Sequence, residues 1–130
     1  GLDTNILARY IIQDDPVQAA RATTLIENSC SAENPGYISS IVLCELVWVL
    51  SRGYRYEKSI TTQVLQQLLT SSELAIEQWE ASWAALRKYK TGTADFSDYL
   101  IGQLNHTHHC KTTYTFDRKA AQGLHFTLLE

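Results

Sequence analysis

The sequence predicts an α/β fold in which a mostly parallel sheet carries helices on both faces. Short apolar runs alternate along the chain with amphipathic segments, an order typical of strands joined by helices. Parallel strands need such long connections, because a tight turn joins only antiparallel ones. The 130 residues, 45% of them hydrophobic, contain no repeat, low-complexity tract or long linker. We therefore expect one domain over residues 1–130.

The N-terminal part of the chain predicts a strand end and two helices. "GLDTN" at 1–5 has the character of a strand end, and "ILARYII" at 6–12 that of a short helix. Because the chain starts abruptly and holds no methionine, we expect this N-terminal strand to be truncated. A longer helix is predicted over 14–29, where Asp15 is placed to cap it and Pro16 occupies its first position.

The next predicted strand is "GYISS" at 36–40, and the helix "IVLCELVWVL" at 41–50 follows it. Either Ser39 or Ser40 can cap this helix. Another helix is predicted over 57–72, because its apolar residues recur at the helical period. They are Ile60, Val64, Leu65, Leu68 and Leu69.

The second half of the chain repeats the alternation of strands and helices. Its predicted strands are "ELAIE" at 73–77, "KTTYTF" at 111–116 and "FTLL" at 126–129. Its predicted helices are 78–89, 95–107 and a short one at 117–122, with "TGTA" at 91–94 as a loop.

We expect five acidic residues near the carboxyl ends of the predicted strands, which is the side of a parallel sheet that forms ligand sites. Asp3 ends the first strand, and Asp117 directly follows the strand at 111–116. Asp95 and Asp98 belong to the first turn of one helix, three positions apart and hence on one face. Glu45 lies near the start of the helix after the second strand. We expect all five near the same sheet edge.

Each acid also has a purely structural interpretation. Glu45 stands among nine apolar residues, where an unpaired carboxylate would be costly, so its partner is a buried arginine, a helix-end dipole or a metal ion. Asp95 and Asp117 suit helix caps, Asp98 suits a first turn, and Asp3 suits a turn after a strand. No single acid decides between these alternatives.

Taken together, the acids favour a metal site. Four or five carboxylates at one edge repel one another unless cations bind. Hard oxygen ligands suit Mg²⁺ or Mn²⁺, which can polarise a phosphate and activate a bound water. The formal net charge of −3 argues against an extended basic surface for nucleic acid, but bound metal would reverse the local field.

Four motifs in this chain resemble those of a PIN-domain nuclease, in particular a VapC-type toxin of a toxin–antitoxin pair. They are "LDTNILARYI", "SSIVLCELVWVL", "ADFSDYLIG" and "TYTFDRKA", in the family's order and spread over the whole chain. The resemblance implies a three-layer α/β/α sandwich with a central, mostly parallel sheet. It also implies a metal-dependent endoribonuclease that hydrolyses RNA phosphodiesters with metal-activated water.

The resemblance carries roles to particular residues. The family's four catalytic and metal-binding acids match Asp3, Glu45, Asp98 and Asp117. Asp95 is an additional acid expected to bind the metal. Polar positions that support those acids match Asn5, Ser40 and Thr115. The expected truncation of the N-terminal strand departs from the family pattern, because few strand residues then precede Asp3.

Partners and location follow from the same resemblance and from composition. The family implies an RNA substrate, a cognate antitoxin and a homodimer, and we expect the aromatic hairpin at 46–56 to be covered by a second chain or an antitoxin helix. The three cysteines form no CxxC pair or framework, which favours a reducing compartment. No apolar run approaches the roughly 20 residues of a membrane span, so we expect a cytoplasmic protein with no membrane partner.

Other functions remain open on the sequence. The same fold could be a catalytically silent binding or regulatory module, although none of the acids is lost. A haloacid-dehalogenase-type phosphatase needs a second acid two residues after the first, where this chain has Asn5. A response-regulator receiver needs an aspartate at a central strand end, where residues 36–40 offer serines.

Three further features have weaker functional interpretations. "NHTHHC" at 105–110 suggests zinc, but its spacing matches no familiar zinc site. Trp79 and Trp83, four residues apart, suggest core or interface before base stacking, and Trp48 is a further stacking candidate. The basic residues that could guide RNA, or simply be solvated, are Arg52, Arg55, Arg87, Lys88 and Lys90.

Overall fold

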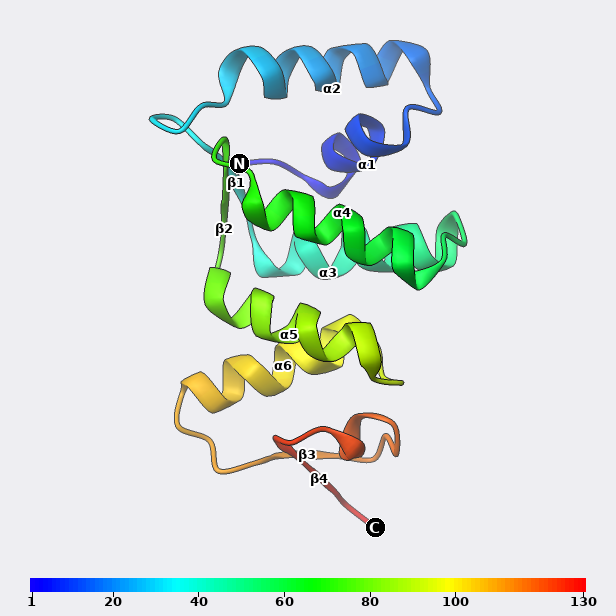
Figure 1. Cartoon of the computed structure of the whole chain (residues 1–130), viewed down its shortest axis with the longest axis vertical. Coiled ribbons are helices and arrows are strands. Elements are labelled where there is room, and N and C mark those ends of the chain that lie inside the picture. Colours follow the sequence, from blue (N-terminus) through cyan, green and yellow to red (C-terminus); the bar gives the residue numbers. More distant parts are fainter. The chain divides into compact units, whose positions relative to one another are not determined.

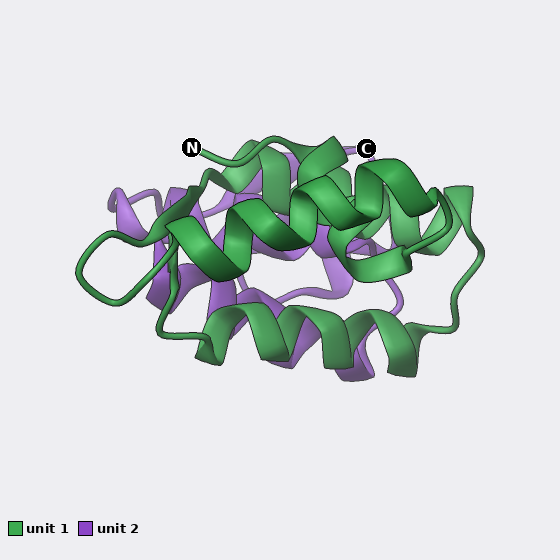
Figure 2. Cartoon of the chain, turned by 90° about the horizontal axis from the view of Figure 1, so that it is seen from above, with its two compact units in different colours: residues 1–77 green, residues 78–130 purple.

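Helices alternate with short strands along the whole chain (Figure 1). The structure, a computed structural model, describes residues 1–130 and divides into two compact units. Unit 1 comprises residues 1–77 and unit 2 residues 78–130, coloured green and purple in Figure 2.

Unit 1 contains one parallel strand pair and most of the helices. Its elements are α1 (Thr4–Ile12), α2 (Pro16–Ser29), β1 (Gly36–Ile38), α3 (Ser40–Trp48), the π-helix η1 (Val49–Gly53), α4 (Lys58–Thr70) and β2 (Leu74–Ile76). Strand β1 pairs in parallel with β2, with Tyr37 opposite Ala75. The predicted strand end at 1–5 contributes one backbone hydrogen bond beside β1, from the Leu2 N–H to the Tyr37 carbonyl at 2.9 Å.

The caps predicted in unit 1 are present. The Asp15 carboxylate accepts from the Gln18 N–H at 3.0 Å, and Pro16 is the first residue of α2. Of the two serines that could cap α3, Ser39 does so by accepting from the Val42 N–H at 3.2 Å. Short polar side chains before an apolar run therefore fixed where these helices begin.

The core of unit 1 is built from leucines and isoleucines of several elements. Fully buried side chains include Leu7, Ile38, Leu43, Leu46, Leu50 and Leu65. Helix α4 has the predicted period but turns a slightly different face inward. Thr61 and Thr62 are buried, whereas Ile60 is 43% exposed. A threonine methyl can fill a core position, so the helical period of the apolar residues did not by itself predict which face of α4 is buried.

Unit 2 contains a second parallel pair. Its elements are α5 (Trp79–Thr91), α6 (Phe96–Thr107), β3 (Thr113–Thr115), the 3-10 helix η2 (Ala120–Gln122) and β4 (Phe126–Leu128). Strand β3 pairs in parallel with β4, with Tyr114 opposite Thr127. The rings of Tyr89 and Phe96 meet edge to face at 5.9 Å and join α5 to α6.

These elements confirm the predicted α/β class with parallel strands. In each unit a segment containing helix connects the two paired strands, as parallel pairing requires. None of the helices combines the length and the apolar character needed to cross a bilayer.

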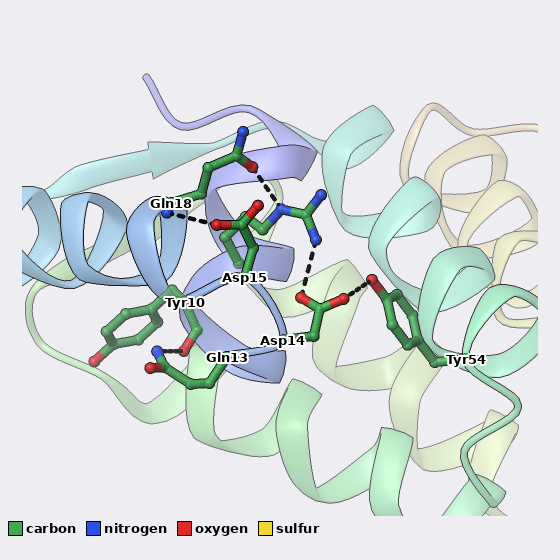
Figure 3. A network of polar contacts seen from close by, with 7 residues as sticks. Tyr10, Gln13, Asp14, Asp15, Gln18 and Tyr54 are labelled. Atoms are coloured by element: carbon green, nitrogen blue, oxygen red, sulfur yellow. Dashed lines mark hydrogen bonds and ion pairs between the residues drawn. The ribbon is translucent and has the colours of Figure 1, made fainter.

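A polar network joins α1, α2 and the segment after η1 in unit 1 (Figure 3). The Arg9 guanidinium donates to Gln18 at 2.7 Å and to the Asp14 carboxylate at 2.9 Å. The Tyr54 hydroxyl donates to the other Asp14 oxygen at 2.7 Å. The hydrogen bond from Tyr54, followed by the bond and charge of Arg9, holds the pKa of Asp14 below its usual range.

Candidate active site

Thr4 links two of the predicted acids in unit 1. Asp3 is the N-cap of α1, and its carboxylate accepts from the Thr4 N–H at 2.7 Å. The buried Thr4 side chain donates from its Oγ1 to Glu45 Oε1 on α3 at 2.8 Å. One residue therefore fixes both carboxylates, and each keeps oxygen atoms for other partners. Thr4 was not among the predicted site residues; its position between Asp3 and Asn5 in "LDTN" was the available signal.

Glu45 is not buried, although nine apolar residues surround it in the sequence. Its side chain is exposed, as are Ile41 (74%) and Trp48 (62%), which follow the same face of α3 at helical spacing. The inward face of α3 consists of Leu43, Leu46 and Val47. An exposed carboxylate pays little desolvation, so the surroundings of Glu45 do not by themselves demand a cation. The metal role of Glu45 stays a prediction.

Neither supporting residue predicted in unit 1 forms a hydrogen bond with Asp3 or Glu45. Asn5 is exposed, and no hydrogen bond joins it to Asp3 or Glu45. The Ser40 N–H donates to the Glu77 carboxylate at 2.8 Å. This bond, above all, holds the pKa of Glu77 below its usual range. Glu77 directly follows β2, so its place after a predicted strand could have identified it.

In unit 2, Asp95 and Asp98 form a capping box at the start of α6. Asp95 is the N-cap, and Asp98 accepts from the Asp95 N–H at 3.2 Å. Partial burial, opposed by that hydrogen bond, and the neighbouring charges of Asp117 and Asp95 raise the pKa of Asp98. The charges of Asp117 and Asp95 thus both oppose the ionisation of Asp98.

Asp117 combines a structural role with this proximity to Asp98. Its Oδ1 accepts from the N–H groups of Lys119 at 2.8 Å and Ala120 at 3.3 Å, which fixes the turn into η2. The Asp117 N–H in turn donates to the Thr115 hydroxyl at 3.0 Å. Thr115 therefore supports the Asp117 backbone, while the second carboxylate oxygen is left for another partner.

The predicted site residues thus form two groups. Thr4 joins Asp3 to Glu45 in unit 1, and Asp95, Asp98 and Asp117 interact electrostatically in unit 2. Within either unit, no three His, Cys, Asp or Glu side chains are arranged to hold a metal ion. The donors are chemically suited to Mg²⁺ or Mn²⁺, because they are carboxylate oxygens. Convergence of the four acids on one pocket stays a prediction.

The weaker candidates form no comparable arrangement. His106 stacks on His125, with ring centroids 4.1 Å apart, and no zinc group forms from residues 105–110. Trp79 and Trp83 meet edge to face at 6.1 Å, and Trp79 is half exposed. Cover of the hairpin at 46–56 by a partner stays a prediction.

The comparisons with known proteins agree with the motifs. A family model described as PIN domain matches residues 2–123, a stretch that contains all the predicted site residues. The comparisons with curated proteins and with solved structures found no match. PIN domains are generally nucleases and usually use divalent metal ions. The chain therefore belongs to the PIN-domain family, whose fold is that of nucleases acting on nucleic acid.

Proposed function

We propose that this protein is a metal-dependent endoribonuclease and the VapC-type toxin of a toxin–antitoxin pair. Asp3, Glu45, Asp98 and Asp117 serve one hydrolytic reaction on RNA phosphodiesters, with Asp95 as an additional acid. The observation that carries the proposal is the pair of hydrogen bonds by which Thr4 holds the carboxylates of Asp3 and Glu45, at 2.7 and 2.8 Å. The family match supports treating residues 1–130 as one domain, because it runs through both units.

The acids supply the chemistry that such a reaction needs. A divalent cation, Mg²⁺ or Mn²⁺, would neutralise the phosphate and make a water more acidic. Asp98, partly buried beside two like charges, would be relieved of repulsion by that cation. Thr4 would keep Glu45 in one orientation, and the caps at Asp95 and Asp117 would keep the unit 2 acids on fixed backbone.

The same proposal includes partners and location. A toxin of this kind acts in the cytoplasm, forms a homodimer and is blocked by its cognate antitoxin. Exposed Trp48 and Tyr54 in the hairpin at 46–56 support a protein partner on that surface. The alternative is a catalytically silent module with the same fold, and it differs from the enzyme in one measurable property, which is acid-dependent cleavage.

Cleavage of a labelled RNA by the purified protein tests the proposal. We expect cutting in Mg²⁺ or Mn²⁺, none in EDTA, and products with 5′-phosphate and 3′-hydroxyl ends, because water rather than the RNA 2′-hydroxyl is the nucleophile. Asp98→Asn and Glu45→Gln should each lower the rate at least a hundredfold, on the order expected for lost charge stabilisation. Glu33→Gln, at an exposed acid of unit 1, is the control and should cut normally.

Three results would count against this proposal. Undiminished cutting in EDTA would exclude the metal, and 2′,3′-cyclic phosphate ends would exclude water as nucleophile. No acid-dependent cutting in any metal, by a protein that is folded, would favour the silent module.

A further inference from the structure

A pocket lies between α1 and α2, and one of its lining residues, Asn5, is two residues after Asp3 in the chain. It has a volume of about 530 Å³ and is lined from α1 by Asn5, Ile6 and Arg9, and from α2 by residues that include Gln18 and Arg21. Asn5 follows Thr4, the residue that holds Asp3 and Glu45. The pocket therefore begins within two residues of an acid proposed to act on RNA.

One arginine of the pocket is fixed in orientation. The Arg9 Nε donates to Gln18 at 2.7 Å and its Nη1 donates to Asp14 at 2.9 Å. Tyr54 holds Asp14 from its other oxygen at 2.7 Å. Neither of the hydrogen bonds to Gln18 and Asp14 uses Nη2 of Arg9, and a guanidinium fixed in this way loses little entropy when it binds an anion.

The second arginine gives the pocket its excess positive charge. Arg21 is exposed and takes part in no hydrogen bond or ion pair, whereas Arg9 is neutralised by Asp14. A guanidinium matches phosphate through two parallel N–H donors. In a chain of net charge −3, one unpaired arginine that lines a pocket is a specific place for an anion.

The rest of the lining is apolar. Ile6, Ala22 and Leu25 complete the walls, and Leu25 is 41% exposed. Apolar walls with a few polar groups are the usual composition of small-molecule sites. The combination suits a nucleotide, whose phosphate would meet the arginines while its base or ribose covers the apolar side chains.

We propose that this pocket is a subsite for one nucleotide of the RNA chain next to the cleaved bond, with its phosphate bound by Arg21 and Arg9. The inference rests on the proposed function, since it assigns the substrate of the same site. It makes Arg21 a substrate-binding residue and Arg9 a second one, oriented by Asp14 and Gln18.

Binding of a fluorescently labelled single-stranded oligoribonucleotide to the Asp98→Asn protein, followed by anisotropy over a range of salt concentrations, tests this subsite. Arg21→Gln in that background should weaken binding about three- to tenfold. It should also reduce the slope of log K against log salt by roughly 0.7, the value for one phosphate contact on a single strand. Arg21→Lys should keep the slope, because the charge remains.

Lys58→Gln is the control. Lys58 is an exposed basic residue of the same unit outside the pocket, so its loss changes the net charge equally but should leave the slope unchanged. The salt slope distinguishes a phosphate contact from a merely structural role, which would alter stability without changing the number of released counterions.

Several outcomes would overturn the subsite: no RNA binding by the Asp98→Asn protein, an unchanged affinity and slope in Arg21→Gln, or an equal loss in Lys58→Gln. Displacement of the RNA by a poly-aspartate peptide at the same concentration as by unlabelled RNA would replace the nucleotide with a general anion or an acidic protein partner. Cleavage by the wild-type protein is measured separately. If wild-type protein cleaves RNA but Arg21→Gln has no effect on RNA binding, only the subsite proposal is wrong. If RNA binding depends on Arg21 but the wild-type protein does not cleave RNA, only the proposed enzymatic activity is wrong.

Discussion

The hydroxyl of Thr4 donates a 2.8 Å hydrogen bond to the carboxylate of Glu45. The two residues are 41 positions apart in the chain, and the bond joins the first turn of α1 to the middle of α3. Because the Thr4 N–H also binds Asp3, a single buried residue controls the orientation of two acids.

Replacing Thr4 by valine should affect catalysis more than folding. Valine keeps the buried volume but leaves Glu45 without its donor, which should cost about 1 kcal/mol of stability. Misorientation of a reacting group is more serious, so RNA cleavage should fall roughly ten- to a hundredfold. Urea unfolding and cleavage rates measure the two effects.

Thr61→Val is the control for Thr4→Val. Thr61 is fully buried on α4, and its hydroxyl has no hydrogen-bond partner. Removing an unsatisfied hydroxyl should leave stability unchanged or raise it by up to about 1 kcal/mol, with normal cleavage. If Thr4→Val and Thr61→Val had equal effects on stability and on RNA cleavage, the Thr4 hydroxyl would have no special role.

The loop before α6 depends on a close approach at Gly92. A Cβ at this position would overlap the Tyr99 hydroxyl and lie 2.9 Å from the Lys88 carbonyl. The Tyr99 hydroxyl accepts from the Ala94 N–H at 3.2 Å, directly before Asp95. Gly92→Ala should therefore destabilise the protein by roughly 1–3 kcal/mol in chemical unfolding.

The control for this glycine is Gly53→Ala. A Cβ at Gly53 would meet only the Val49 side chain at an ordinary 3.9 Å, so stability should be almost unchanged. A tolerated Gly92→Ala would mean that Tyr99 moves freely, and the capping box at Asp95 would then not depend on it.

The polar network around Asp14 should make stability depend on pH. The hydrogen bond from Tyr54, above all, lowers the pKa of Asp14 in the folded protein. Its stabilisation is thus present above the unfolded-state pKa, about 3.9, and is lost as pH falls through the folded-state pKa. Asp14→Asn should lower Tm by about 1–3 °C at pH 7, because an exposed network contributes little, and by less as pH falls below 4.

A double-mutant cycle separates Asp14 from its surroundings. Tyr54→Phe removes the donor alone, and its effect should not add to that of Asp14→Asn, since both variants break the same hydrogen bond. The network would be contradicted if the effects of Tyr54→Phe and Asp14→Asn on Tm were strictly additive. It would also be contradicted if the Tm difference between wild type and Asp14→Asn grew toward low pH.

The elements and their starts were predictable because their signals are local. Asp15 and Pro16 mark the start of α2 within two residues, and Ser39 caps α3 three residues from its donor, so neighbouring letters contain the information. The α/β class follows from the same local alternation of apolar patterns.

The partners of the site residues were not predictable in this way. Thr4 meets Glu45, and Ser40 meets Glu77 at a separation of 37 positions, because β1 pairs with β2 and α1 packs near α3. The face that α3 turns outward, with Ile41, Glu45 and Trp48, depends on what packs against the helix. An almost wholly apolar segment has no periodic signal for that choice.

Metal binding should be detectable without any enzymatic readout. Asp98 is close enough to Asp117 and Asp95 for their charges to oppose its ionisation. Without metal, Asp98→Asn should therefore leave Tm unchanged or raise it, since it removes one of the repelling charges while its side-chain oxygen still accepts from the Asp95 N–H. Adding Mn²⁺ should stabilise the wild-type protein by about 2.7 kcal/mol at a hundred times its Kd, and the Asp98→Asn protein by much less.

Glu33→Gln, which changes the net charge equally at an exposed acid, should respond to Mn²⁺ like wild type. Scanning calorimetry over a Mn²⁺ titration measures all three proteins. Equal stabilisation of all three by Mn²⁺, or none in wild type, would mean that these acids repel one another without forming a metal site.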